Sequence, residues 1–200
     1  RGLALILDET YRDFHSGEGA PHGLFADPVW DETLIHLYSF SKVYRLTGHR
    51  VGALVAAEAR IAQAEKFLDT VTICPGRLGQ VAALHGIRHL GAWVAGERLE
   101  ILHRRSLMER AFAQGVGGWR LLSCGAYFAF LEHPFDQASD AVAKVLVERS
   151  SLLALPGTMF SPGRADGGDG SAERTLRLAF ANADAAGIET CVERLRAFSL

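Results

Sequence analysis

The sequence predicts an α/β fold for the first half of the chain, followed by a long helix and a separate α+β domain. Apolar runs without polar alternation lie at Leu3–Leu7, Leu34–Phe40 and Val51–Ala56. Such runs are typical of strands covered on both faces in a largely parallel sheet. The helical pattern over Leu78–Ala113 is longer than most helices of globular proteins. After a glycine-rich break at 115–118, short strand and helix patterns follow each other.

In the first half, residues 12–33 are rich in Gly, Pro and Asp and are predicted to form a loop. A helix is expected over Ala57–Leu68, where apolar residues recur at helical spacing among good helix formers. The Cys-Pro-Gly sequence at 74–76 is expected to end that helical region. In the longer helical stretch beyond it, either Gly91 or Gly96 is expected to create a break.

The second half is predicted to contain four strands and two helices around a polar, glycine-rich loop at 156–173. The strands are expected at Trp119–Leu122, Ala126–Leu131, Leu152–Leu155 and Thr175–Ala181, and the helices at Ala138–Arg149 and Ala185–Phe198. We place the domain boundary within the long helix, so that one domain covers 1–95 and a smaller one covers 96–200.

Charge and cysteine content exclude several classes of protein. The chain carries 21 Lys and Arg against 23 Asp and Glu, a net charge of −2, which gives no electrostatic reason to expect nucleic acid or an anionic membrane as partner. No apolar run approaches the roughly 20 residues that span a bilayer. Cys74, Cys124 and Cys191 are irregularly spaced and lack a zinc-like pattern, so we expect no metal site and free thiols in a cytoplasmic protein.

The first candidate site is the sequence Asp8-Glu9-Thr10-Tyr11, directly after the first predicted strand. Open α/β sheets bind ligands at the carboxyl ends of their strands. An aspartate at such a position is more often a cap or turn residue, so this motif alone is a weak signal.

The second candidate site joins Ser39, Ser41 and Lys42 to Arg50, which lies between Gly48 and Gly52. Alternation along an extended strand end would place the two serine side chains on one side. Two hydroxyls and an arginine make a reasonable phosphate clamp, because the guanidinium presents a planar fork to phosphate oxygens. A lone Lys or Arg is usually a solvated surface residue, but Lys42 adjoins an apolar strand.

The third candidate is Arg177, inside the apolar strand pattern of 175–180. A charge in such a strand is costly to bury unless it is paired. Two interpretations remain open: an edge strand whose arginine faces solvent, or a receptor for a carboxylate, for which arginine is the best side chain.

Taken together, the motifs resemble the pyridoxal-phosphate-dependent class I/II aminotransferases of fold type I. The matching sequences are DETY at 8–11, SFSK at 39–42, GHRVG at 48–52 and LRLAFA at 176–181. The resemblance implies that Lys42 holds pyridoxal 5'-phosphate as a Schiff base and moves the proton during transfer. It implies that Asp8 pairs with the pyridine nitrogen and that Tyr11 hydrogen-bonds the 3' oxygen of the ring.

The same resemblance assigns the remaining candidates. Ser39 and Arg50 would bind the cofactor phosphate, while Ser41 either bonds the phosphate or orients the turn. Arg177 would clamp the α-carboxylate of the substrate. The implied substrates are an amino acid and a 2-oxo acid, and the full-length enzyme is expected to be a homodimer.

Part of the family's site has no counterpart in these 200 residues. The phosphate-cradling turn, the aromatic residue that stacks on the ring and the Asn of an N-P-x-N-P-T-G stretch do not occur. The resemblance therefore implies the C-terminal part of an enzyme of roughly 400 residues. On this interpretation 1–95 holds the last strands and helices of the large α/β domain and the start of the connecting helix. Residues 96–200 are the small α+β domain, and this fragment alone is expected to be inactive.

Other functions stay open at this point. A lyase, a decarboxylase or an acyl-transferring synthase of the same fold type shares the lysine and aspartate, although Arg177 favours a substrate that keeps its α-carboxylate. The effector domain of a transcription regulator would carry a winged-helix domain upstream. A scaffold without activity is disfavoured, because it has no reason to retain Lys42, Asp8, Tyr11 and Arg50.

Overall fold

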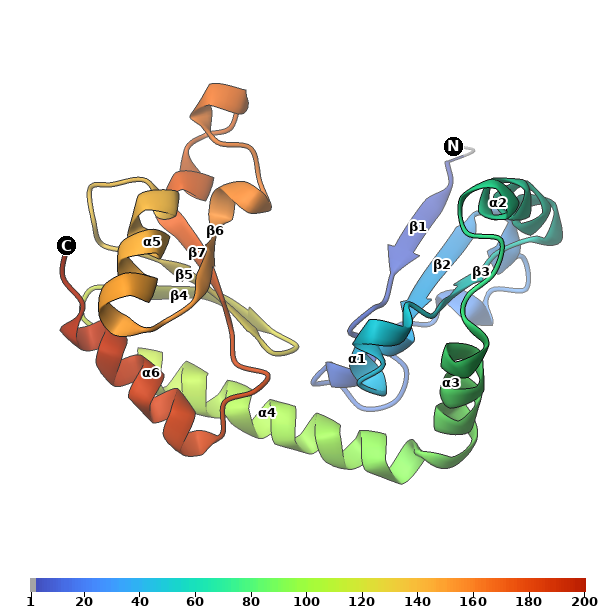
Figure 1. Ribbon diagram of the computed structural model, residues 1–200, viewed down its shortest axis with the longest axis horizontal. Coiled ribbons are helices and arrows are strands. Elements are labelled where there is room, and N and C mark those ends of the chain that lie inside the picture. The colour runs from blue at the N-terminus through green and yellow to red at the C-terminus, as the bar shows by residue number, and fades with distance from the viewer. Residues whose placement is uncertain (1–2) are drawn as a thin grey trace. The chain divides into compact units, whose positions relative to one another are not determined.

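The computed structural model describes residues 3–200, which form two compact units (Figure 1). Unit 1 is Arg1–Arg98 and unit 2 is Leu99–Leu200. The division falls within helix α4 (Gly91–Ala113), which contributes residues to both units. No helix among residues 3–200 is long and apolar enough to cross a membrane.

Unit 1 contains a three-stranded sheet in the order β1-β2-β3, formed by Leu5–Asp8, Leu34–Ser39 and Gly52–Val55 (Figure 1). β1 and β2 are parallel, but β2 and β3 are antiparallel. The expectation of parallel pairing is therefore confirmed for β1 and β2 and wrong for β2 and β3. The segment 40–51 between these two strands reverses the direction of the chain, so that β3 returns alongside β2.

The first strand is present but not buried within the described structure. It begins at Leu5 rather than Leu3, and Leu5 and Ile6 are 45% and 64% exposed. Among residues 3–200, β1 pairs only with β2, so its other edge has no partner strand. The prediction of a fully buried strand at Leu3–Leu7 thus fails here, because an apolar run needs neighbouring elements to cover it.

Four helices belong wholly or partly to unit 1: α1 (Phe40–Val43), α2 (Glu58–Val71), α3 (Arg77–His89) and the start of α4. The long helical stretch is divided at Leu90, immediately before Gly91, which confirms the expected break. A small core of Phe40, Val43, Val51 and Ala83 joins α1, the residue before β3 and α3. The segment that follows β2 is thus held in place by α3.

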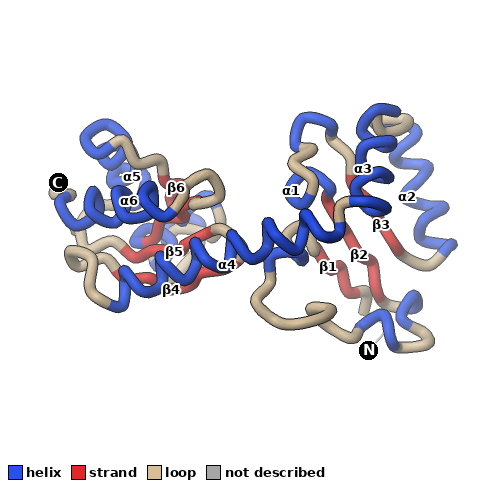
Figure 2. The backbone as a smooth tube through the Cα atoms, turned by 90° about the horizontal axis from the view of Figure 1, so that it is seen from below, coloured by secondary structure: helices blue, strands red, loops and turns tan. Residues whose placement is uncertain are grey.

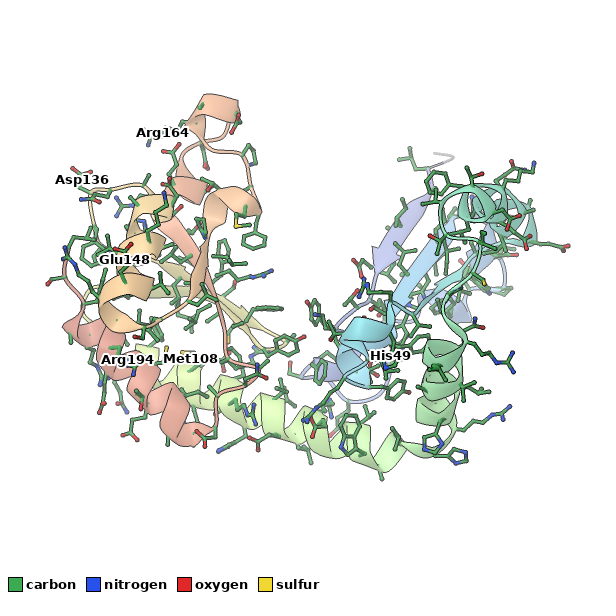
Figure 3. All side chains as sticks on the ribbon, in the orientation of Figure 1. His49, Met108, Asp136, Glu148, Arg164 and Arg194 are labelled. Atoms are coloured by element: carbon green, nitrogen blue, oxygen red, sulfur yellow. The ribbon has the colours of Figure 1, made fainter. Side chains whose placement is uncertain are left out.

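Two glycines let α3 approach this segment closely. A Cβ atom on Gly86 would lie 2.8 Å from the ring of Tyr44, and one on Gly79 would lie 3.2 Å from the Cβ of His49. Figure 3 shows His49 beside α3. Larger residues at these two positions would push α3 away from the connection between β2 and β3.

Unit 2 contains an antiparallel sheet in the order β4-β5-β7-β6 (Figure 1). Its elements are β4 (Arg120–Gly125), β5 (Phe128–Glu132), α5 (Ser139–Ser150), β6 (Ala154–Pro156), β7 (Thr175–Ala179) and α6 (Ala185–Ala197). All four predicted strands and both helices are present. Residues 123–125, which lie between the first two predicted strands, belong to β4, and the turn follows at Ala126, whose φ is 47°.

The core of unit 2 lies where α4, α5 and α6 pack with the sheet (Figure 2). Met108 on α4 is fully buried among these elements (Figure 3). Leu146 on α5 and Leu195 on α6 are also fully buried or nearly so. The indole of Trp119 donates a hydrogen bond of 3.1 Å to the carbonyl oxygen of Leu195, so this polar group remains satisfied inside the core.

His133 makes the stability of unit 2 sensitive to acid. Its side chain is fully buried, with Nε2 3.2 Å from the carbonyl oxygen of Glu173, and burial lowers its pKa below the usual 6.5. As the pH falls, His133 therefore binds a proton more readily in the unfolded chain than in the folded unit. The contribution of neutral His133 to the free energy of unfolding is fully present above the pKa that this histidine has in the unfolded chain. It is lost as the pH falls below that pKa, by at most about 1.4 kcal/mol per pH unit.

Thermal unfolding between pH 7.5 and 5 measures this effect. The fall in melting temperature should be smaller in His133→Gln than in the unchanged protein. His103→Gln is the matched control, since His103 is exposed on α4. An equal acid response in the unchanged protein and in His133→Gln would contradict the prediction.

Candidate functional site

The turn from β2 into α1 carries three of the predicted site residues. Ser39 ends β2 and caps α1, because its Oγ accepts a 3.3 Å hydrogen bond from the backbone N–H of Ser41. Ser39 and Ser41 therefore do not alternate along one extended strand as expected, since the helix begins at Phe40. Lys42 lies in α1, directly beyond the carboxyl end of β2, and is half-buried.

Arg50 reaches back to this turn. Its Nη1 donates a 2.9 Å hydrogen bond to the carbonyl oxygen of Thr47 and lies 3.5 Å from Oγ of Ser41. The structure thus brings Ser41 and Arg50 together, while the hydroxyl of Ser39 accepts the capping bond. One phosphate group placed here would find a hydroxyl and a guanidinium side by side.

The backbone around Arg50 is strained. Arg50 adopts the left-handed conformation with φ 50° and ψ 49°, which costs a non-glycine residue about 1–2 kcal/mol. Gly52 follows, where a Cβ atom would lie 2.7 Å from the carbonyl oxygen of Tyr38. Strain of this kind is retained where the surrounding structure fixes it, and here it directs the guanidinium toward α1.

Asp8 lies at the carboxyl end of β1, and β1 and β2 run parallel, so Asp8 and the β2–α1 turn share one edge of the sheet (Figure 1). Its Oδ1 accepts hydrogen bonds from the backbone N–H of Thr10 at 3.0 Å and from the hydroxyl of Thr10 at 2.7 Å. These bonds hold the pKa of the Asp8 carboxyl below its usual value. The carboxylate is therefore negatively charged at neutral pH and exposed for an ionic partner.

The loop that carries Tyr11 is tied to β2. The hydroxyl of Tyr38 donates a 2.5 Å hydrogen bond to Oδ2 of Asp13. Burial, together with this carboxylate, raises the pKa of Tyr38, so the hydroxyl stays a neutral donor. Tyr11 is half-buried two residues before Asp13, and this anchor restricts where its ring can move.

Sequence reasoning missed Glu9, whose side chain turns inward next to Asp8. Glu9 is 7% exposed, with its carboxylate oxygens 2.7 Å from Nε2 of His36 and 3.1 Å from both Nε2 of His22 and Nη1 of Arg12. Strand alternation was the available signal, since it sends two neighbouring acidic side chains to opposite faces. The structure places no group of three metal-ligating side chains suitably for an ion among residues 3–200.

Arg177 belongs to a central strand, not to an edge. β7 lies between β5 and β6, which excludes the interpretation of a solvent-facing edge arginine. The carbon at the centre of its guanidinium lies 4.4 Å from the ring centroid of Phe128 and 4.2 Å from that of Phe160. Among residues 3–200 no carboxylate pairs with Arg177, so its N–H groups remain available to a ligand.

Comparisons with known proteins give a consistent result. The family model "Aminotransferase class I and II" matches residues 1–195. The chain is 27% identical to an aspartate aminotransferase of Sulfurisphaera tokodaii, over 79% of this chain and 40% of that protein. It is 30% identical to histidinol-phosphate aminotransferase 2 of Rhizobium meliloti, over 76% of this chain and 41% of that protein.

A solved structure extends the likeness across both units. The α-aminoadipate aminotransferase LysN of Thermus thermophilus, in complex with N-(5'-phosphopyridoxyl)-L-leucine, matches with a TM-score of 0.82 and 25% identity. The match covers 98% of this chain and 49% of that one. The chain thus spans about half the length of the relatives it matches, and the predicted fold class, the C-terminal part of a fold type I enzyme, is confirmed.

Proposed function

Because the chain belongs to the class I and II aminotransferase family, we propose that the whole protein moves an amino group between an amino acid and a 2-oxo acid. Members of this family use pyridoxal 5'-phosphate. In this proposal residues 1–95 are the C-terminal part of the large cofactor-binding domain with the start of the connecting helix. Residues 96–200 are the small domain.

The observation that carries the proposal is the position of Lys42. It follows β2 in the first turn of α1, with the Ser41–Arg50 pair next to it and the charged Asp8 at the same sheet edge. This set places an amine, a phosphate clamp and a carboxylate at one end of the sheet. A cofactor that carries an aldehyde, a phosphate and a pyridine nitrogen requires these three groups.

The donor chemistry of unit 1 fits the cofactor. Ser41 and Arg50 would hold the phosphate, with Ser39 keeping the turn in place through its capping bond. Asp8 would hold the ring nitrogen, since hydrogen bonds from Thr10 keep its carboxyl ionised. Tyr11 is proposed to reach the 3' oxygen. When bound, the cofactor supplies the electron sink that makes the α-carbon of the substrate acidic.

Within this assignment each side chain has a separate task. The amine of Lys42 would take the proton from the α-carbon of the amino donor and, in the second half of the reaction, would deliver a proton to the α-carbon derived from the 2-oxo acid. The charge of Asp8 would keep the pyridine nitrogen protonated. Arg177 binds the α-carboxylate through its planar fork and so fixes which bond at the α-carbon is broken.

Arg50 provides a quantitative check of the phosphate clamp. Arg50→Ala should weaken cofactor binding about 10–100-fold, because one charge-assisted hydrogen bond is worth roughly 1.5–3 kcal/mol. Equilibrium dialysis of the whole protein with pyridoxal 5'-phosphate measures the change, and pyridoxal, which lacks the phosphate, serves as control ligand. Equal weakening of both ligands would count against a phosphate contact.

The proposed activity is tested by incubating the whole protein with cofactor, each common L-amino acid and 2-oxoglutarate or pyruvate, and measuring the new amino acid formed. Release of ammonia or carbon dioxide without amino transfer would instead identify a lyase or a decarboxylase. Residues 1–200 alone are assayed in parallel. We expect them to be inactive, because they span about half of the relatives' length.

We also propose that the whole protein is a homodimer in the cytoplasm. Large apolar side chains on α2 and α3 are exposed within unit 1, namely Phe67, Leu68, Leu78, Val81, Leu84 and Ile87. Such surface supports burial against further protein. The three cysteines are free, in keeping with a reducing compartment. Light scattering coupled to size exclusion would measure the mass in solution.

A further inference from the structure

The Arg177 guanidinium lies against two aromatic rings from different parts of unit 2. Phe128 comes from β5, the neighbouring strand, in which Phe130 is paired with Arg177. Phe160 comes from the segment after β6. The rings lie 4.4 and 4.2 Å from the guanidinium carbon, within the range of a cation–π contact.

These contacts leave the hydrogen-bond donors of the guanidinium unused. A phenyl ring has no oxygen or nitrogen acceptor, so neither ring takes up the N–H groups of Arg177. Among residues 3–200 no carboxylate pairs with Arg177. The rings therefore restrict the orientation of the cation, while its N–H groups stay available to a carboxylate.

The segment that carries Phe160 is held against β7. Gly157 is buried, and a Cβ atom on it would lie 2.0 Å from Oγ1 of Thr175, the first residue of β7. Only glycine permits this approach. Phe160 lies three residues later, where its backbone N–H donates a 2.9 Å hydrogen bond to the carbonyl oxygen of Gly157. Its ring is thus placed by a short, well-anchored turn, although 43% of the residue is exposed.

We propose that Phe160, together with Phe128, is a positioning residue that acts through Arg177 to select substrates carrying an α-carboxylate. The proposal rests on the assignment of Arg177 under the proposed function. Phe160 contributes no donor or acceptor of its own. Its role is to hold the guanidinium plane in the orientation that a bidentate carboxylate needs, so that less side-chain freedom is lost on binding.

Two pairs of amino donors separate this role from a general structural one. L-Glutamate and 4-aminobutyrate differ by the α-carboxylate, as do L-alanine and ethylamine. In the whole protein with cofactor, Phe160→Leu should lower kcat/KM for the amino acids about 5–30-fold, mostly through KM. Activity with the two amines should change less than about twofold. Phe160→Tyr, which keeps an aromatic face, should restore most of the loss.

The second arm is a double-mutant comparison. In an Arg177→Leu background, Phe160→Leu should have no further effect on the amino acids, because the group it positions is gone. Met159→Leu is the matched control, since Met159 is the exposed neighbour of Phe160 and changes from one apolar residue to another. Calorimetric titration with 2-oxoglutarate gives a readout independent of turnover, and Phe160→Leu should weaken this binding by a similar factor.

Two results would overturn the proposal. An equal loss for amino acids and amines would show that Phe160 only maintains the fold, and an unchanged kcat/KM would show that the ring does not position Arg177. The underlying assignment fails separately, if Arg177→Leu itself leaves the preference for L-glutamate over 4-aminobutyrate unaltered.

Discussion

Replacing Lys42 with alanine is expected to lower the rate of amino-group transfer by about 10⁴-fold or more. Proton transfer by a positioned side chain is worth roughly 10²–10⁴-fold, and the variant also loses the amine that holds the cofactor covalently. Lys42→Arg should be nearly as impaired, because a guanidinium stays protonated and is a poor nucleophile. The measurement is a single-turnover assay of the whole protein with its amino donor.

The chain provides two matched controls for this experiment. The other lysines, Lys66 and Lys144, are both exposed on helices, so Lys66→Ala and Lys144→Ala should keep full activity. Borohydride reduction of the loaded protein, followed by peptide mapping, should attach the cofactor to Lys42 alone. Attachment at Lys66 or Lys144, or full activity of Lys42→Ala, would show that Lys42 is not the reacting amine.

The elements of both units follow from local sequence patterns, whereas their neighbours in the sheets do not. β7 was expected because Thr175–Ala181 is apolar, yet the pattern left open whether Arg177 lies at an edge. Its central position depends on pairing with β5 and β6, which are distant in the chain. The contact between Phe160 and Arg177 is likewise not predicted, because Phe160 lies in a segment whose composition is typical of a polar loop. Strand order and ring contacts are non-local properties, and a single sequence carries little signal for them.

The β2–α1 turn shows a second limit of local reasoning. The motif placed the two serines and Lys42 correctly at the end of β2, but the alternation argument assumed that the strand continues through Ser41. The chain instead enters a four-residue helix at Phe40, which is too short to leave a periodic pattern. As a result Ser39 caps the helix and Ser41 meets Arg50. The sequence therefore predicts which residues meet at this turn, but it does not predict that Ser39 caps the helix while Ser41 contacts Arg50.

Replacing Glu9, a residue that the sequence motifs did not single out, is expected to cause the largest loss in the free energy of unfolding. Its carboxylate is buried and contacts three side chains. His36 lies on β2, His22 in the loop between β1 and β2, and Arg12 in the 3₁₀ turn Arg12–Phe14. Glu9→Ala would leave the ring nitrogens of two histidines without this partner in a site that excludes water. Removing one member of a buried ionic cluster typically costs about 3–5 kcal/mol, and the partial exposure of Arg12 places Glu9 at the lower end, about 3 kcal/mol.

Urea unfolding of the whole protein measures this loss as a lower midpoint at unchanged slope. Glu18→Ala is the matched control, because Glu18 lies in the loop after β1 and is exposed, and it should unfold like the unchanged protein. Glu9→Gln should lie between the two, since the amide keeps the shape and part of the hydrogen bonding but not the charge. Glu9 directly follows Asp8 in the chain, so loss of the contacts that hold the Glu9 side chain inside the fold is expected to shift Asp8 as well. Glu9→Ala should therefore weaken cofactor binding as well. If the unfolding midpoint of Glu9→Ala equals that of Glu18→Ala, the cluster around Glu9 contributes nothing to the stability of the fold.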